Sequence, residues 1–301
     1  MSCPFCEAPV VAGDAFCETC GHSLTSPACT SCGAPAVDAE GYCERCGLRQ
    51  PTGRDHAELE LPDGTAGITD RGLRRARNED AFSLVPLAPR GTVPVPESAA
   101  TVPRRPADAD ARDGGGAPAV VAVVCDGVGS SPRADDASSA AVEAAADALA
   151  RGLTHEEAFA LAGQAVRKLA TGPDDAPACT YVAAVARPDR VSICWAGDSR
   201  AYWLPDGTLL TEDDVARGGE ITAWLGADYP DVTPRTRVFT PPGPGLLLVC
   251  SDGLWRYLNG YAFPAAGTPL GMARRMLRHA LDSGGHDNVT ICLIPLGGTH
   301  G

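Results

Sequence analysis

Eight of the 13 cysteines lie within residues 3–46, and their spacing is the strongest constraint on how this chain can fold. The segment CPFCEAPVVAGDAFCETCG is followed by CTSCGAPAVDAEGYCERCG, so the pattern C-x2-C, ten residues, C-x2-C occurs twice. Two thiolates separated by two residues can reach one ion, and ten residues allow a hairpin to return with the second pair. Four thiolates that can surround one ion tetrahedrally are the typical ligand set of a structural Zn²⁺ site. The first predicted zinc site uses Cys3, Cys6, Cys17 and Cys20, and the second uses Cys29, Cys32, Cys43 and Cys46.

A disulfide-rich module is the alternative, but dense cysteines in a cytosolic chain favour metal binding. The segment has few large apolar side chains, so bound metal must supply its stability. Residues 3–49 contain six acidic residues and only two basic ones. We therefore expect the module to bind a protein partner rather than a nucleic acid.

The rest of the composition narrows the function classes. The net charge of −13 argues against nucleic acid or an anionic membrane as a general partner. No apolar run approaches the ~18 residues of a membrane span, and the start MSCPFCEAPV has neither the basic beginning nor the apolar middle of a signal peptide. A cytoplasmic protein is the expectation.

Composition also divides the chain. Residues 1–50 form the predicted double zinc ribbon, residues 51–62 (PTGRDHAELELP) read as a linker, and residues 63–297 form the main body. Within the body, residues 88–118 are rich in proline, alanine, glycine and charge, which leaves little to bury. We predict that this insertion is a disordered surface loop.

Most strands of the body follow one another directly, and the helices come in separate blocks. One helix is predicted from Ser131-Pro132, one from Thr154 with Glu157 completing a capping box, and one from Thr268-Pro269 to Gly284. This order is typical of an α+β fold with antiparallel sheets. The predicted strands are 64–70, 81–87, 119–125, 180–187, 190–197, 200–204, 235–240, 245–251 and 289–295.

Carboxylates stand at the ends of several of these strands. Asp80 precedes one strand and Asp126 ends the next, so an antiparallel hairpin would place them side by side. Asp252 and Asp287 are related in the same way, and Asp198 ends a further apolar strand. An isolated Asp-Gly pair is more often a turn, but converging carboxylates repel one another unless cations hold them ionised. All-oxygen ligation favours Mg²⁺ or Mn²⁺.

The segments RARNEDAF, CDGVGSS, AGDSRAY, CSDGLW and HDNVT stand in an order and spacing that resemble the metal-dependent type 2C serine/threonine protein phosphatases, most closely the bacterial branch. The resemblance covers about residues 63–297, and the five motifs together make it specific. It implies a four-layer α-β-β-α sandwich with two central antiparallel sheets and a two-metal centre at one end. It also implies hydrolysis of phosphoserine and phosphothreonine in proteins, with substrates supplied by a serine/threonine kinase in a signalling system.

The resemblance assigns roles to individual residues. Asp80, Asp126 and Asp287 correspond to metal ligands through carboxylates and bound waters, Gly127 to a carbonyl contact, and Asp252 to a ligand of the second ion. Asp198 matches a third, weaker metal position, and Arg75 matches the arginine that holds the substrate phosphate. The implied cofactors are two Mg²⁺ or Mn²⁺ ions, or three if the Asp198 position is filled, besides two Zn²⁺ in the ribbons. A water shared by two cations would then attack phosphorus in line.

This chain departs from the family pattern at three places. Ala178-Cys179-Thr180 stands where Gly-Thr-Thr is frequent, and Val128 replaces a histidine common in eukaryotic members. The segment between LTEDD and ITAWLG is short, so the flap on the substrate side is reduced. These departures bear on substrate choice more than on the metal ligands.

Two other functions fit parts of the sequence. Cys250 to Arg256, CSDGLWR, has the C-x5-R spacing of cysteine-dependent phosphatases, although Cys250 follows an apolar run and burial raises a thiol pKa. The second alternative is a catalytically weak or inactive phosphatase fold that acts as a zinc-ribbon interaction module. Inactive copies usually lose a ligand aspartate, whereas every family metal position is filled here. Cys179, Cys194 and Cys292 are expected to pack as small apolar residues.

Overall fold

The computed structural model describes residues 9–10, 34, 43–47, 54–87, 119–172, 175–229, 231–264 and 266–297. The chain divides into two compact units, Met1–Asp55 and His56–Gly301, and each is described by itself. In the first unit, the Gly47 amide donates to the Cys43 carbonyl at 2.8 Å, and Gly47 has a φ of +70°. Glycine suits this left-handed turn because it has no Cβ. The other predicted zinc ligands apart from Cys46, and the insertion at 88–118, lie outside the described residues.

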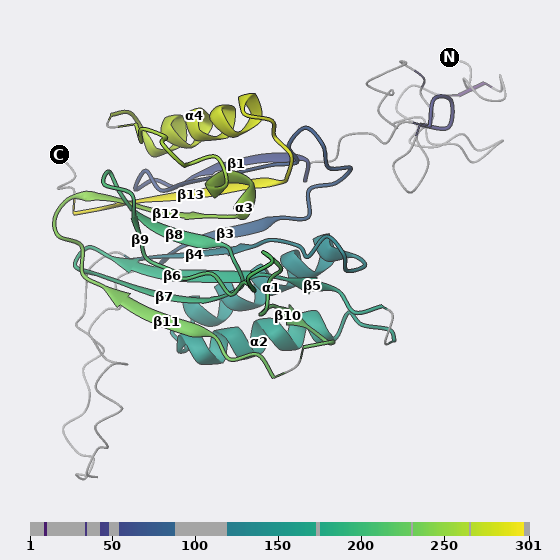
Figure 1. Cartoon of the computed structure of the whole chain (residues 1–301), viewed down its shortest axis with the longest axis horizontal. Helices are drawn as coiled ribbons and strands as arrows, with labels where there is room; N and C mark the ends of the chain where they lie inside the picture. Colours follow the sequence, from purple (N-terminus) through teal and green to yellow (C-terminus); the bar gives the residue numbers. More distant parts are fainter. Residues whose placement is uncertain are drawn as a thin grey trace, which may run out of the picture. The chain divides into compact units, whose positions relative to one another are not determined.

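Two antiparallel sheets form the centre of the second unit, as predicted (Figure 1). The first has the strand order β1-β2-β13-β12-β8-β9, and the second β11-β7-β6-β4-β3. The short strands β5 (Ala178–Cys179) and β10 (Leu225–Gly226) pair separately. The first sheet comprises β1 (His56–Glu60), β2 (Ala66–Asp70), β8 (Arg200–Leu204), β9 (Thr208–Leu209), β12 (Gly245–Cys250) and β13 (Val289–Leu296). The second comprises β3 (Ala81–Leu87), β4 (Ala119–Cys125), β6 (Tyr181–Arg187), β7 (Arg190–Ala196) and β11 (Arg235–Phe239).

Helices cover the outer face of each sheet. Helices α1 (Ala134–Ala150) and α2 (His155–Arg167) lie on one side of the unit, and α3 (Asp252–Trp255) and α4 (Pro269–Asp282) lie on the other (Figure 1). The two faces of β4 contact different layers. Val121 and Val123 on one face pack with α1 and α2, and Val120 and Val124 on the other face pack between the sheets. A strand buried on both faces needs an unbroken apolar run. The result is the predicted four-layer α-β-β-α arrangement.

The helix ends agree with the sequence in two cases and differ in one. Thr154 and Glu157 form the predicted capping box, and the Thr268 hydroxyl accepts the first-turn amide of α4. The first helix, however, begins at Ala134 rather than at Ser131-Pro132, after Arg133 in a left-handed conformation with φ 49°. The reason is that the Ser131 hydroxyl bonds to Val128 and Ala178 instead of capping a helix.

The predicted linker at 51–62 is wrong in part, because its residues 56–60 form strand β1 on the edge of the first sheet. Four of these five side chains are exposed, which gives the segment the polar composition of a linker. Glu58 also accepts hydrogen bonds from Arg274 of α4.

Within the part of the chain that the structure describes, no helix is long and apolar enough to span a bilayer.

Candidate metal centre

The first pair of candidate ligands meets at the end of the β3–β4 hairpin. Ala81 pairs with Cys125 in an antiparallel register. Asp80 precedes Ala81 and Asp126 follows Cys125, so the register sets the two carboxylates next to each other. The predicted hairpin is thus confirmed, and it joins residues separated by the insertion at 88–118.

The second pair meets at the end of β12 and β13. Cys250 pairs with Ile291, which brings Asp252 at the start of α3 close to Asp287, two residues before β13. The approach depends on Gly253, because a Cβ there would lie 1.9 Å from the Asn288 carbonyl oxygen. Any side chain at position 253 would therefore push the two segments apart.

Five carboxylates lie near one another at one edge of the sandwich, and the pKa values of four of them are raised. Burial raises the pKa of Asp80 to about 7, with the charge of Asp252 adding to the effect and a hydrogen bond from Ser251 opposing it. Burial, and then the charge of Asp252, raises the pKa of Asp198 to about 6. Burial raises the pKa of Asp126 well above its ordinary value, helped by the charges of Asp80, Asp252, Asp287 and Asp198. Buried like charges are stable as anions only when a cation accompanies them.

Protein partners already orient three of these carboxylates. The Ser251 hydroxyl donates to Asp80 Oδ2 at 2.7 Å and accepts the Thr290 amide at 3.0 Å. Asp287 Oδ2 lies 2.7 Å from Arg75 Nη2, and Asp252 Oδ2 lies 2.7 Å from Arg256 Nη2. Asp80 and Asp252 are therefore each held at one oxygen, whereas the second oxygen of Asp287 accepts the Asn288 amide at 2.9 Å.

The remaining oxygens fit hard divalent cations. Asp80 Oδ1 and Asp252 Oδ1 are buried and have no hydrogen-bond partner, although buried polar atoms are nearly always paired. Among the described residues, no three His, Cys, Asp or Glu side chains already surround one point as metal ligands do. The donor set itself, carboxylates and backbone carbonyls, is the one that Mg²⁺ and Mn²⁺ prefer.

Asp126 and Gly127 are fixed through their backbones. The Asp126 amide donates to Thr180 Oγ1 at 3.0 Å, and the Thr180 amide donates to the Asp126 carbonyl at 2.7 Å. The Gly127 amide donates to the Glu79 carbonyl at 3.1 Å. The departure at Ala178-Cys179-Thr180 thus keeps a threonine that holds the candidate ligand in place.

Arg75 lies beside the carboxylates, on the solvent side. Its guanidinium is partly exposed, and Asp287 is its hydrogen-bond partner. A Cβ on Gly129 would lie 2.9 Å from Arg75 Nη1, so the glycine makes room for the arginine. The guanidinium is therefore partly open to solvent at this edge.

The structure contradicts the cysteine-phosphatase alternative. Cys250 is fully buried in β12, and burial raises the pKa of its thiol well above the ordinary value. Arg256 holds Asp252 rather than forming an anion-binding loop around the sulfur. Cys179, Cys194 and Cys292 are buried in the hydrophobic core, as predicted.

Three residues organise this edge through contacts that were not predicted from the sequence. Ser251 holds Asp80, and Arg256 holds Asp252. The Asn288 side chain accepts the Glu79 amide and donates to the carbonyls of Arg71 and Arg77, all at 2.8 Å. Ser251 and Asn288 are each adjacent to a candidate ligand in the chain, and that adjacency was the available signal.

Comparison with known families identifies the class. A family model described as protein phosphatase 2C matches residues 107–280, and a model described as double zinc ribbon matches residues 3–47. The first match covers more than half of the chain, which therefore belongs to the protein phosphatase 2C family. It leaves out Arg75, Asp80 and Asp287, which the fold brings to the same edge as Asp126 and Asp252.

Solved structures agree on the fold. Stp1 from Staphylococcus aureus, a serine/threonine phosphatase, is 20% identical with a TM-score of 0.62, over 81% of this chain and 98% of that one. The Mycobacterium tuberculosis serine/threonine phosphatase PstP/Ppp is 22% identical with a TM-score of 0.55, over 78% and 98%. The catalytic domain of PstP in complex with two manganese ions is 23% identical with a TM-score of 0.55, over 76% and 96%. The sequence matches no curated protein.

Proposed function

We propose that the unit from His56 onward hydrolyses phosphoserine and phosphothreonine in proteins with the help of two Mg²⁺ or Mn²⁺ ions. The observation that carries the proposal is the convergence of five carboxylates whose burial and mutual repulsion call for cations. Asp80, Asp126 and Asp287, with the Gly127 carbonyl, would hold one ion and contribute to the other, which Asp252 completes. Asp198 offers a third and weaker position.

Each of the chain's own groups has a task in this reaction. Ser251 and Thr180 keep Asp80 and Asp126 in place, so little reorganisation is needed when substrate arrives. Arg75 can bind two phosphate oxygens at once and orient the phosphorus for in-line attack. Bound divalent cations supply an acidified water and neutralise charge on the phosphate. No side chain needs to act as the nucleophile.

Activity on phosphothreonine peptides tests the proposal directly. We expect purified protein to release phosphate in Mn²⁺ or Mg²⁺ and to stop when EDTA is added. An inactive fold that serves only as an interaction module would release none under any metal. Activity that survives EDTA would contradict the metal-dependent reaction.

Replacing Arg75 with alanine should reduce kcat/KM on a phosphopeptide by roughly 10- to 100-fold, because charge-assisted hydrogen bonds to phosphate are lost. The protein should stay folded, since the Arg75 side chain is 40% exposed. Arg74→Ala is the matched control, as Arg74 is an exposed neighbour in the chain. Normal kinetics in the Arg75 variant would remove this residue from the site.

We further propose that the ribbons bind two Zn²⁺ ions structurally and dock a protein partner. Eight cysteines fill two four-thiolate sites and leave no open coordination position. A fragment of residues 55–301 retains β1 and the whole second unit, so it should hydrolyse a small phosphopeptide within about twofold of the intact chain. Elemental analysis of the intact protein should give two zinc ions per chain. A zinc-free intact protein, or a well-folded but inactive fragment, would refute this role.

A further inference from the structure

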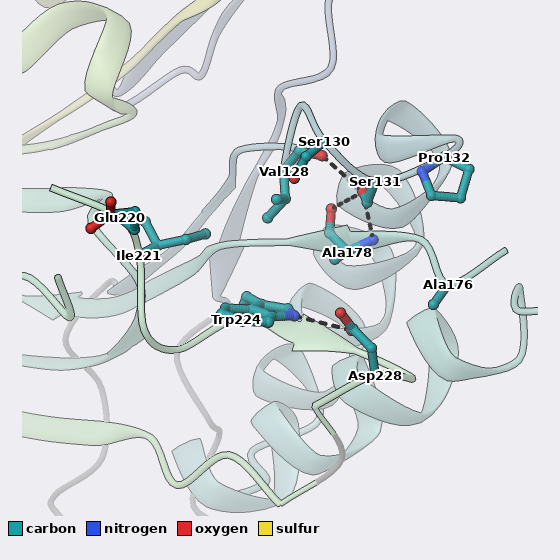
Figure 2. A pocket seen from close by; sticks show the side chains of 10 residues that line it. All are labelled: Val128, Ser130, Ser131, Pro132, Ala176, Ala178, Glu220, Ile221, Trp224 and Asp228. Carbon is teal, nitrogen blue, oxygen red and sulfur yellow. Dashed lines mark hydrogen bonds between the residues drawn. The ribbon is translucent and has the colours of Figure 1, made fainter. Parts of the chain in front are cut away.

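A cavity of about 500 Å³ lies beside the candidate metal centre, and the reaction chemistry does not use it. Figure 2 shows Val128 and Ser130, from the loop after β4, on one side and Trp224 on the other. Glu220 and Asp228 stand at opposite ends of the view. The cavity is therefore formed between the loop that follows Asp126 and the segment from Glu220 to Asp228.

Hydrogen bonds make this cavity a preformed site. The Val128 amide donates to the Ala178 carbonyl at 2.9 Å, and the Ser131 hydroxyl donates to the Val128 carbonyl at 2.8 Å while accepting the Ala178 amide at 3.1 Å. On the other side, β10 pairs with β5, with Leu225 opposite Cys179. Both walls are thus fastened to the strand that precedes Thr180, which holds Asp126. A site whose walls are fixed loses little entropy on binding.

The cavity lies next to Arg75, the residue proposed to bind the substrate phosphate. Val128 and Ser130 line it, and Gly129 between them lies against Arg75. A phosphorylated residue held by Arg75 would therefore place a nearby residue of its own chain over the cavity. The occupant should be a side chain of the substrate, within a few residues of the phosphate.

The lining indicates which side chain fits. The ten described residues around the cavity include Glu220 and Asp228 but no lysine, arginine or histidine. Trp224 offers a ring that is packed 5.0 Å from Tyr229, and its indole N–H donates to Asp228 Oδ1 at 3.1 Å. Gly226 allows this contact, because a Cβ there would lie 2.4 Å from Asp228 Oδ1. An aromatic face next to a fixed carboxylate attracts a cation that carries an apolar stem.

We propose that this cavity is a specificity site for a basic side chain, arginine or lysine, close to the phosphorylated serine or threonine. The proposal rests on the proposed phosphatase function. The apolar stem packs along Val128, Ile221 and Trp224, and the charged end lies over the Trp224 ring towards Asp228. Acidic side chains at the same position of a substrate are repelled.

A peptide series tests the proposal. In phosphothreonine peptides with alanine elsewhere, one arginine is moved from three residues before the phosphothreonine to three residues after it. We expect one position to raise kcat/KM roughly tenfold over the all-alanine peptide. Glutamate at that position should lower it below the alanine value. Hydrolysis of p-nitrophenyl phosphate, which has no flanking residues, separately reports whether the protein is a phosphatase at all.

Variants of the lining residues are tested by the ratio of kcat/KM for the best arginine peptide to kcat/KM for the all-alanine peptide. Asp228→Asn keeps an oxygen for the Trp224 N–H but loses the charge, so the arginine-to-alanine ratio should fall to about twofold or less. Glu220→Gln should reduce the ratio by a smaller factor. Glu143→Gln, on the exposed side of α1, is the matched control and should leave the ratio unchanged.

Three results would overturn the proposal while p-nitrophenyl phosphate is still hydrolysed. The first is a flat arginine profile in the wild-type protein. The second is an equal gain with leucine at the preferred position, which would make the site apolar rather than cation-binding. The third is an arginine preference that persists in both Asp228→Asn and Glu220→Gln.

Discussion

Replacing Asp126 with asparagine is expected to abolish phosphatase turnover and, at the same time, to stabilise the metal-free protein. The loss should be roughly a thousandfold or more, because removing one ligand forfeits several kcal/mol of transition-state stabilisation. The gain in stability has the opposite sign, because Asp126 is a buried carboxylate surrounded by other carboxylates. Asn keeps the size of the side chain and removes the repulsion. Asp252→Asn should behave in the same way.

Two measurements separate this result from simple damage to the fold. Thermal unfolding in EDTA at pH 8 should give a higher Tm for Asp126→Asn than for the wild type, with about 2–4 °C expected for each kcal/mol in a domain of this size. Asp147→Asn, which changes an exposed residue of α1, should leave turnover intact. Cys250→Ser should retain most of the activity, because its sulfur is buried in a strand. If Cys250→Ser were inactive and EDTA harmless, the metal-dependent mechanism would be wrong.

Mn²⁺ should stabilise the protein strongly at pH 8 and only weakly at pH 5. The pKa of Asp80 is raised from 3.8 to about 7 in the folded protein. Between these values the folded state holds a proton that the unfolded chain has released, so the stability of the metal-free protein falls as pH rises through this window. Below about pH 4 both states are protonated, and above pH 7 the whole penalty is present. A bound cation removes that penalty, so its effect is largest at high pH.

Tryptophan fluorescence is the suitable measurement, because all four tryptophans lie within residues 195–255 and report on the second unit alone. With Mn²⁺ at 100 times its Kd the stabilisation is about 2.7 kcal/mol, which corresponds to roughly 5–10 °C in Tm at pH 8. The shift should shrink at pH 5, where Mn²⁺ must displace a proton from Asp80. It should also shrink in Asp126→Asn. An equal or larger shift at pH 5 would show that these carboxylates do not bind the metal.

The main hairpins of the fold could be predicted because their strands are apolar runs with clear ends. Residues 81–87, 119–125 and 200–204 form strands with the predicted bounds. The capping box at Thr154 was likewise predicted from local sequence, since every atom that it uses lies within four residues. Strand β1 was missed because an edge strand exposed on both faces has no apolar pattern to recognise.

The contacts around the carboxylates could not be predicted from the sequence. The bond from Ser251 to Asp80 joins residues 171 positions apart, and the ion pair of Arg75 with Asp287 joins residues 212 apart. The spacing from Cys250 places Arg256 in a C-x5-R motif, but in the structure Arg256 donates a hydrogen bond to Asp252. Local spacing carries no information about which distant partner a side chain will meet.

The sequence alone determined the class of fold, the zinc-binding pattern and the five aspartates at strand ends, because each depends on periodicity or spacing within a few residues. The convergence of the aspartates was also predicted from the strand order. Only the tertiary structure decided that their shared edge is buried, that Thr180 and Ser251 fix two of them, and that Trp224 and Asp228 face the loop after Asp126. The physical reason is burial. Desolvation and repulsion between carboxylates arise only when segments distant in the chain exclude water together. The pairing of β5 with β10 likewise joins distant segments, and Ala178 and Trp224 from these segments line the cavity.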